Sequence, residues 1–266
     1  MAYTVYDNNR VVLREYTYSS SRVPDSFDGF RICLVTDYHN EDNYEKVYEA
    51  VEKADADIIC IGGDFVDMNT EDFTNAREFA KRLAAIGDVY YTFGNHEAWS
   101  TTYNDTEEPI VVSELADTGV KFLNDEVVSI KRDGEVINLV GYGDSIYDDI
   151  DGNFEKKAKK KLKELYSTLD KDVFSVLVFH RAQYFDMTSA IGYDMVLSGH
   201  LHGGQINIGI VRDYILNKYF GTAEYVKGQY NKNGSVMYIC GGTSKKNGIY
   251  RVLNTPEVVV VELQAE

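Results

Sequence analysis

The chain has 266 residues, 44% of them hydrophobic, which is enough to fill a substantial core. Its 43 acidic residues outnumber 27 basic ones, and this net charge of −16 disfavours a stable nucleic-acid partner or a cationic membrane-binding surface. With three prolines and no Ser/Gly-rich linker, residues 1–266 are predicted to form a single domain, in which a lead-in segment (residues 1–30) precedes the core (residues 31–266).

Strands and helices alternate in the first part of the core. Buried strands are predicted at residues 31–36, 57–61 and 89–93. Between them, apolar residues recur at helical spacing, in one stripe through Tyr44, Val47, Tyr48 and Val51 and in another through Phe73, Ala76, Ala80, Leu83 and Ile86. This alternation predicts parallel strands with right-handed crossovers, and the carboxyl ends of such strands share one edge of the sheet.

The second part of the core has a different order. Residues 127–130 and 136–140 are predicted to form a hairpin around Asp133-Gly134. A helical stripe follows through Phe154, Ala158, Leu162, Leu165 and Leu169, and further strands are predicted at residues 173–179, 194–197, 236–240 and 258–263. Together the elements predict an α/β fold of two packed sheets with helices outside. Cys33, Cys60 and Cys240 lie in apolar runs and are expected to be buried reduced thiols.

All five histidines of the chain lie in short polar runs that follow hydrophobic stretches. Together with Gly62-Gly63-Asp64, these runs are Thr36-Asp37-Tyr38-His39, Gly94-Asn95-His96-Glu97, Phe179-His180 and Ser198-Gly199-His200-Leu201-His202. Each run alone has an ordinary structural explanation, such as a turn, a loop cap or a hydrogen-bonded core histidine. Because the runs use every histidine and follow predicted strand ends, we interpret them as parts of one metal site.

The residue types in these runs form a mixed nitrogen and oxygen ligand set. The candidate ligands are Asp37, His39, Asp64, Asn95, His180, His200 and His202. They are too many for one tetrahedral zinc ion but suit two adjacent divalent ions, which lower the pKa of a bridging water and clamp a phosphoryl group for in-line attack. His96 is left over, and we interpret it as the general acid that protonates the leaving oxygen.

In order and approximate spacing, these motifs resemble those of the calcineurin-like metallophosphoesterases, from about Pro24 to Leu263. Residues 197–206, together with Arg251 and Pro256-Glu257, are similar to a bacterial phosphohydrolase subgroup with the SGHxHGGQI motif. The resemblance implies the metallo-dependent phosphatase fold, a four-layer α/β/β/α sandwich of two mixed sheets. It also implies that Asp37, His39, Asp64 and His202 hold one ion, that Asp64, Asn95, His180 and His200 hold the other, and that His96 is the general acid.

Two departures from the family's patterns disfavour particular classes within the family. The run after Gly63-Asp64 lacks the arginine of protein Ser/Thr phosphatases, and Asp67 stands where purple acid phosphatases have a metal-bound tyrosine. Both classes are therefore disfavoured. Tyr38 and Ala182 stand where relatives often have leucine and proline, which changes the expected pocket wall but removes no ligand.

We therefore expect an enzyme, a dinuclear metal-dependent phosphoesterase that hydrolyses a phosphomonoester or phosphodiester by attack of metal-bridging hydroxide. Two Mn or Fe ions are the favoured cofactors, with Zn, Ni or Co as alternatives. The alternative functions are a catalytically silent scaffold or binding module of the same fold, and a nuclease, which the net charge disfavours.

The expected partner is a small-molecule phosphoester, selected by residues 99–109, 145–153 and 211–230. Tyrosines in these segments (Tyr147, Tyr214, Tyr219 and Tyr225) are interpreted as packing residues.

No segment approaches the roughly 18–20 apolar residues that span a bilayer, and residues 1–10 are too polar for a signal peptide. The chain as given is therefore expected to be soluble. Relatives in the resembling subgroup often carry a membrane-spanning or export segment before the stretch that corresponds to Tyr3–Phe30. The full-length product is accordingly expected to be either cytoplasmic or anchored outside the cytoplasm, with membrane contact only through such an upstream segment.

Overall fold

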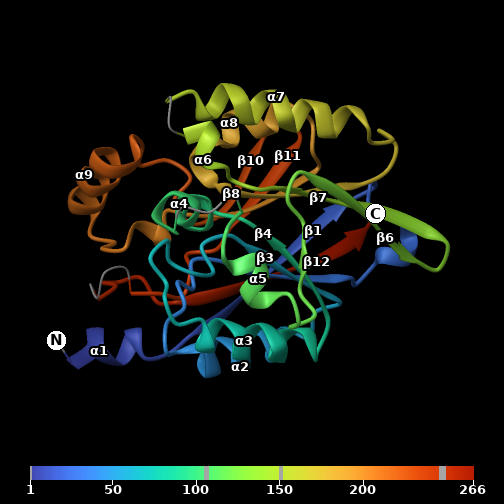
Figure 1. Cartoon of the computed structure of the whole chain (residues 1–266). Coiled ribbons are helices and arrows are strands. Elements are labelled where there is room, and N and C mark those ends of the chain that lie inside the picture. Colours follow the sequence, from blue (N-terminus) through green and yellow to red (C-terminus); the bar gives the residue numbers. More distant parts are fainter. Residues whose placement is uncertain (1, 105–107, 150–151, 246–249) are drawn as a thin grey trace.

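The computed structural model describes residues 2–104, 108–149, 152–245 and 250–266, and these contain two six-stranded sheets (Figure 1). In spatial order, the first sheet consists of β1 (Val12–Ser20), β12 (Glu257–Ala265), β2 (Arg31–Val35), β3 (Ile58–Gly62), β4 (Asp88–Thr92) and β5 (Lys121–Phe122). The second consists of β10 (Gly228–Lys232), β11 (Ser235–Ile239), β9 (Met195–Gly199), β8 (Ser175–Arg181), β7 (Glu135–Tyr142) and β6 (Glu126–Arg132).

Both sheets are mixed, with a run of four parallel strands in each. In the first sheet β2, β3, β4 and β5 run parallel, and β12 is antiparallel to β2. In the second sheet β7, β8, β9 and β11 run parallel, while β6 and β10 pair antiparallel at the two edges. Parallel strands need crossover connections, which the helices between them provide.

The helices cover the outer faces of the two sheets (Figure 1). Helices α2 (Tyr44–Ala54) and α3 (Thr74–Ala84) lie against the first sheet, and α7 (Phe154–Ser167) and α8 (Phe185–Ser189) lie against the second. The layers are therefore α/β/β/α, which confirms the predicted fold. Three apolar clusters fill the spaces between successive layers, because the buried side chains of each strand alternate between its two faces.

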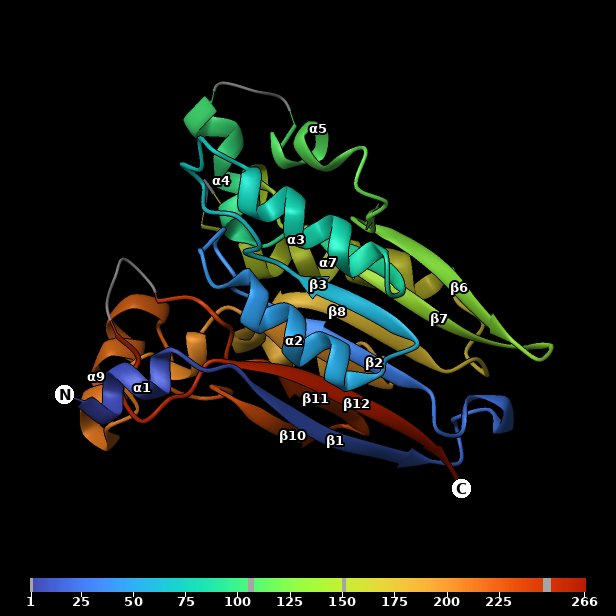
Figure 2. The same cartoon turned by 90° about the horizontal axis from the view of Figure 1, so that it is seen from below.

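The remaining helices are short or lie at the ends of the sheets. They are α1 (Ala2–Asn8), α4 (Asn95–Asn104), α5 (Val111–Leu115), α6 (Ile146–Asp149) and α9 (Gly209–Phe220), with 3-10 turns η1 (Asp25–Phe27), η2 (Ala182–Tyr184) and η3 (His202–Gly204). Figure 2, viewed from the side of α2 and α3, places α1, α4 and α9 at the end of the molecule opposite the C-terminus. No helix among the described residues is long and apolar enough to cross a membrane.

The structure refines several sequence predictions. The predicted strands are present, with ends that shift by one or a few residues, and all three cysteines are buried free thiols. The prediction for Ile86 is wrong: it lies beyond the end of α3 and is 39% exposed.

Part of the lead-in segment is also a full member of the first sheet, since β1 pairs with β12 along its whole length. Its mixed polar and apolar residues reflect the partial exposure of an edge strand.

Substitution of the core between the sheets tests this arrangement. Ile32 is fully buried in β2 and faces the second sheet. Ile32→Ala is expected to lower the free energy of unfolding by about 2–5 kcal/mol, because the lost methyl groups leave a cavity between two rigid layers. Chemical denaturation measures this, with the exposed Ile86→Ala as the matched control, expected to change it by less than about 0.5 kcal/mol. Equal effects of the two substitutions would contradict the assignment of Ile32 to the core.

Candidate metal centre

Each predicted site residue lies at the same edge of the sandwich, where parallel strands of both sheets end. Asp37 and His39 follow β2, Asp64 follows β3, and Asn95 and His96 begin α4 after β4. In the second sheet His180 lies near the end of β8, and His200 and His202 follow β9. The two sheets therefore contribute the two halves of one site, because the carboxyl ends of their parallel strands lie at the same edge.

The backbone around these residues is unusual. Five of the eight predicted site residues have left-handed φ values, namely Asp37 (51°), His39 (54°), Asp64 (52°), His200 (78°) and His202 (48°). Such values are uncommon for residues other than glycine and cost free energy. Backbone bonds hold the strained segments in place: Asp37 N–H donates to Gly63 O at 3.1 Å, and His39 N–H donates to Asp64 O at 3.0 Å. The two loops after β2 and β3 thus turn their side chains toward one point.

One cluster of four side chains combines both sheets. Ligand atoms of Asp37, His39, Asp64 and His202 all lie within 4.8 Å of one another. His39 Nε2 lies 3.4 Å from His202 Nε2 and 3.8 Å from Asp64 Oδ2. His202 Nε2 is also 3.4 Å from Asp37 Oδ1. Two imidazoles and two carboxylates at these separations match the donor set that first-row divalent ions bind.

A second cluster shares Asp64 with the first. It contains Asp64, His180 and His200, whose ligand atoms also lie within 4.8 Å of one another. His180 Nε2 is 3.1 Å from Asp64 Oδ2 and 3.3 Å from His200 Nδ1. The other ring nitrogen of His180 donates to Gly62 O at 2.7 Å, which leaves Nε2 to face the cluster.

Buried oxygen atoms support a role for cations here. Asn95 Oδ1 is buried and accepts no hydrogen bond from the described residues, and the buried Asp64 Oδ2 has His180 Nε2 as an ion-pair partner at 3.1 Å. A buried acceptor with no donor costs free energy unless a positive charge or a donor compensates it. Divalent ions held by the two clusters would supply that charge, and Asn95 would add a neutral oxygen ligand. The residues present therefore fit two metal ions.

Asp64 and the histidines around it shift one another's pKa values. Burial acts to raise the pKa of Asp64, but His180, His96 and His39 outweigh it and hold this pKa well below its ordinary value. Burial acts to lower the pKa of His180, but the charge of Asp64 outweighs it and raises this pKa to about 10. The Asp64 carboxylate thus remains ionised at neutral pH and attracts positive charge to the point where the two clusters meet.

His96 differs from the other histidines in its partner. Its Nδ1 lies 3.1 Å from Asp67 Oδ1, whereas its Nε2 lies 4.0 Å from Asp64 Oδ2. Since a carboxylate only accepts, Asp67 holds a proton on Nδ1 and directs Nε2 toward the cluster. Asp67 Oδ2 also lies 3.4 Å from His39 Nδ1, so this carboxylate lies beside two imidazoles. Sequence reasoning considered Asp67 only as a departure from another class and did not predict this role.

Glu97 is a second contributor that sequence reasoning did not assign. Its fully buried carboxylate accepts hydrogen bonds from the N–H groups of Asp64 (2.9 Å), Phe65 (2.7 Å), Val66 (3.2 Å) and Gly94 (2.8 Å), and from the Tyr91 hydroxyl (2.7 Å). It therefore joins the loops that carry Asp64 and Asn95. Burial and the charge of Asp64 raise the pKa of Glu97. The available sequence signal was an acid in the first turn of a helix, where it stabilises unpaired N–H groups.

The close approach of these two loops also requires glycine. A side chain at Gly63, whose φ is 93°, would lie 2.5 Å from His180 Nδ1. A side chain at Gly94 would overlap the Asp64 carboxylate. The glycines in the two motifs are thus explained by space at the cluster as well as by turn geometry.

Arg251 supports the loop of His202 from behind. This fully buried guanidinium donates to His202 O at 3.1 Å, to Gly241 O at 2.6 Å and to Ser244 O at 2.7 Å. Ser244 N–H in turn donates to Asp37 O at 3.1 Å. Arg251 therefore connects the segments that hold two ligands from different sheets.

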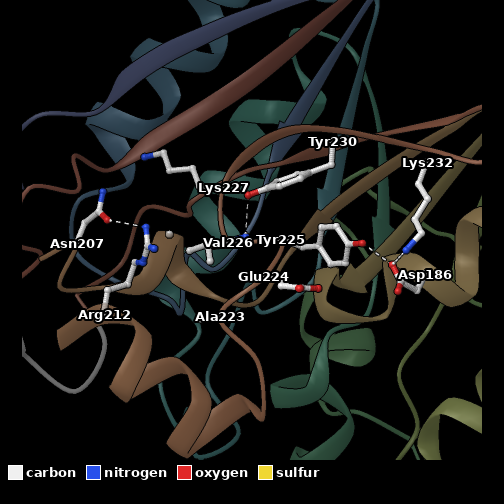
Figure 3. Close-up of a pocket in the computed structure, with 11 residues that line it drawn as sticks. Asp186, Asn207, Arg212, Ala223, Glu224, Tyr225, Val226, Lys227, Tyr230 and Lys232 are labelled. Atoms are coloured by element: carbon white, nitrogen blue, oxygen red, sulfur yellow. Dashed lines mark hydrogen bonds and ion pairs between the residues drawn. The ribbon is translucent and has the colours of Figure 1, made fainter. Parts of the chain in front are cut away.

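A cavity of about 790 Å³ adjoins the centre (Figure 3). Its wall includes Gly203, directly after His202, and basic side chains from Arg212, Lys227 and Lys232. In Figure 3, Arg212 and Asn207 lie across the cavity from Tyr230 and Lys232, with Val226 between them. The predicted selectivity segment 211–230 therefore consists largely of α9 and the wall of this cavity. Of the other two selectivity segments, residues 105–107 and 150–151 lie outside the described residues.

The interpretation of four tyrosines as packing residues holds for one of them. Tyr225 packs its ring against Phe185 and Tyr230, with centroid distances of 5.4 and 5.1 Å. It is wrong for Tyr147, Tyr214 and Tyr219, which are 72%, 67% and 68% exposed. Their helices place them at the surface, which the sequence pattern did not reveal.

Comparisons with known proteins identify related sequences. The profile of the family described as "Calcineurin-like phosphoesterase" matches residues 30–204. The chain is 24% identical to the uncharacterized metallophosphoesterase YkuE of Bacillus subtilis, over 94% of this chain and 85% of YkuE. It is also 24% identical to the uncharacterized metallophosphoesterase Cj0846 of Campylobacter jejuni, over 97% of this chain and 66% of that relative.

Two solved structures are similar in fold. TT1561 of Thermus thermophilus has a TM-score of 0.53 at 15% identity, and the match covers 81% of this chain and 91% of that one. Phosphopantetheinyl hydrolase of Mycobacterium tuberculosis has a TM-score of 0.51 at 13% identity, and the match covers 84% of this chain and 93% of that one. At these identities the likeness concerns the fold alone.

The role of Glu97 can be tested by metal binding. Glu97→Gln keeps the shape of the side chain but replaces an acceptor oxygen with a donor that faces backbone N–H groups. We expect metal affinity to fall by about 10–100-fold, as for other residues that orient metal ligands. Calorimetric titration of the metal-free protein with Mn²⁺ measures this, and Glu155→Gln, an exposed change in α7, is the control. Unchanged affinity in a folded Glu97→Gln variant would show that Glu97 does not position the ligands.

Proposed function

The chain belongs to the calcineurin-like phosphoesterase family, and from this premise we propose that it is a dinuclear hydrolase of a small-molecule phosphomonoester or phosphodiester. The observation that carries the proposal is that two groups of candidate ligands share Asp64, whose Oδ2 lies 3.8 Å from His39 Nε2 and 3.1 Å from His180 Nε2. A single structural ion would need one closed set of about four ligands, whereas here Asp64 is shared by two groups of candidate ligands.

We take the division of ligands from the family resemblance. Asp37, His39, Asp64 and His202 would hold one ion, and Asp64, Asn95, His180 and His200 would hold the other. The two clusters support this division for every residue except Asn95, which is in neither of them. When bound, such a pair of ions lowers the pKa of water and stabilises the charge on a phosphoryl group. The mixed imidazole and carboxylate donors suit Mn or Fe, and also Zn, Ni or Co, so metal availability decides among them.

His96 would supply the proton for the leaving oxygen. Asp67 holds the proton on Nδ1, so the proton that His96 transfers is the one on Nε2, which faces the clusters. His96 is 6% exposed, and this enclosure limits competition from bulk water for that proton. Such a group contributes about 10²–10⁴-fold to turnover when the leaving group is a poor one.

Metal removal and Asp64→Ala test the shared centre. Chelation is expected to abolish hydrolysis of a chromogenic phosphoester, and Mn²⁺ or Fe²⁺ is expected to restore it. Asp64→Ala is expected to bind fewer than two ions per chain and to show no detectable turnover, because both clusters lose a carboxylate. Elemental analysis gives the metal content, with Asp88→Ala, a surface change in β4, as the control. Two ions per chain in Asp64→Ala, or turnover by the metal-free protein, would refute the proposed centre.

The leaving group tests His96. His96→Ala is expected to lower kcat by about 10²–10⁴-fold for alkyl phosphoesters and much less for activated aryl phosphoesters, because only a poor leaving group needs a proton. Asp67→Asn should show the same dependence on the leaving group with a smaller loss. Steady-state kinetics over a series of leaving groups measures both variants, with metal content as the check on the centre. Equal losses for alkyl and aryl substrates would argue against the acid role.

A further inference from the structure

Helix α9 is unusually apolar for a helix that lies at the surface. Its sequence runs from Gly209 to Phe220, and Leu216 is its single buried residue. Ile210 is 85% exposed, Tyr214 is 67% exposed and Tyr219 is 68% exposed. A small cluster of Leu201, Leu216 and Val226 attaches the helix to the domain. Most of the apolar surface of α9 therefore faces solvent, which is the reverse of an ordinary amphipathic helix.

Two exposed apolar residues outside the helix, Ile208 and Leu253, lie at its start. We call Ile208, Ile210, Val211, Tyr214, Tyr219 and Leu253 the α9 face, and each of these side chains is more than a third exposed. Leu253 is held beside the start of α9, because Asn207 N–H donates to Val252 O and Asn207 Nδ2 donates to Leu253 O. Exposed apolar groups that gather in this way are typical of surfaces that bind a partner.

Basic residues outnumber acidic ones in the stretch of sequence that contains α9. Residues 205–255 contain seven Lys and Arg residues against two acids, a formal charge of +5, whereas the rest of the chain carries −21. Within this stretch Arg251 is buried, and Arg212, Lys227 and Lys232 pair with Asp213, Glu257 and Asp186. Among the described residues, the positive charge that stays unpaired in this stretch therefore comes from Lys218 and Lys245. Because salt screens charges beyond roughly 8–10 Å, a bound surface would respond to this local charge rather than to the distant acidic residues.

Two of these lysines lie beside exposed tyrosines. Lys218 Nζ is 5.2 Å from the ring centroid of Tyr219, and Lys245 Nζ is 5.9 Å from that of Tyr250. Neither ammonium forms an ion pair with any residue of the described ranges. Ile210, Tyr214 and Lys218 follow one another at i, i+4 spacing on the outward side of α9. Lysines beside tyrosines and aliphatic side chains match the headgroup region of a lipid bilayer.

The α9 face also adjoins the proposed active site. The ring of Phe220, the last residue of α9, lies 5.1 Å from the ring of His200. At its other end Arg212 packs against Gly204, two residues after His202. Figures 1 and 2 both show α9 and α1 at the end of the molecule where the ligand-bearing strands terminate. A surface bound at α9 would therefore lie next to the metal centre.

We propose that the α9 face docks on a bilayer that contains anionic phospholipid. The aliphatic and aromatic side chains of α9 enter the headgroup region, and Lys218 and Lys245 contact lipid phosphates. Docking is a property of this surface and does not require the phosphoesterase activity. It places the metal centre at the membrane surface, where phosphoesters attached to lipids are available.

Vesicle co-sedimentation tests the proposal with the full chain. The protein is expected to bind phosphatidylcholine vesicles that contain phosphatidylglycerol, and to bind pure phosphatidylcholine vesicles more weakly. Ile210→Asp is expected to lower the partition coefficient by about tenfold or more, because it places a carboxylate in the apolar contact. Lys218→Gln and Lys245→Gln are each expected to lower it about fivefold, the usual contribution of one basic residue near an anionic membrane.

Ile86→Asp is the matched control, since it changes an exposed isoleucine that lies between α3 and β4 and not in the α9 face. It should bind vesicles as the unmodified protein does, and thermal unfolding should show that all variants are folded. No vesicle binding by the unmodified protein, or equal losses in Ile86→Asp and Ile210→Asp, would overturn the proposal. Self-association that Ile210→Asp abolishes, without vesicle binding, would also overturn it and assign the α9 face to a second copy of the chain.

Discussion

Five hydrogen-bond donors converge on the buried carboxylate of Glu97, and the arrangement of the proposed centre depends on them. A buried carboxylate is costly unless its lone pairs are satisfied. The loops after β3 and β4 must therefore stay in the conformation that surrounds it. Asp64 stands on one of these loops and Asn95 on the other, so a single buried acid fixes ligands that lie on different strands.

The sandwich adds the second half of the centre. The core between the sheets contains residues of β2 and β3 from one sheet and of β8 and β9 from the other, and it keeps their carboxyl ends at one edge. His180 and His202 thereby reach carboxylates that arise far earlier in the chain. The left-handed backbone of five site residues persists because hydrogen bonds and packing around them allow no relaxed alternative.

Much of this site could be predicted from the chain alone. The strands have strong apolar patterns, and the motif residues follow them directly, so topology alone predicted that the histidines would gather. Asp67 and Glu97 were not assigned roles, since their functions depend on distances to His96 and to backbone N–H groups. The exposure of Tyr214 and Tyr219 was also missed, because an apolar helix in a sequence is ordinarily interpreted as a buried one.

The sequence by itself determined the α/β class, the inner strands of both sheets and the set of candidate ligands, because periodicity and residue type are local properties. The tertiary structure decided how closely the candidate ligands approach Asp64, which carboxylate lies beside His96 and which helix exposes its apolar side chains to solvent. These depend on contacts between residues far apart in the chain. Their geometry follows from how two sheets pack, and no local pattern records it.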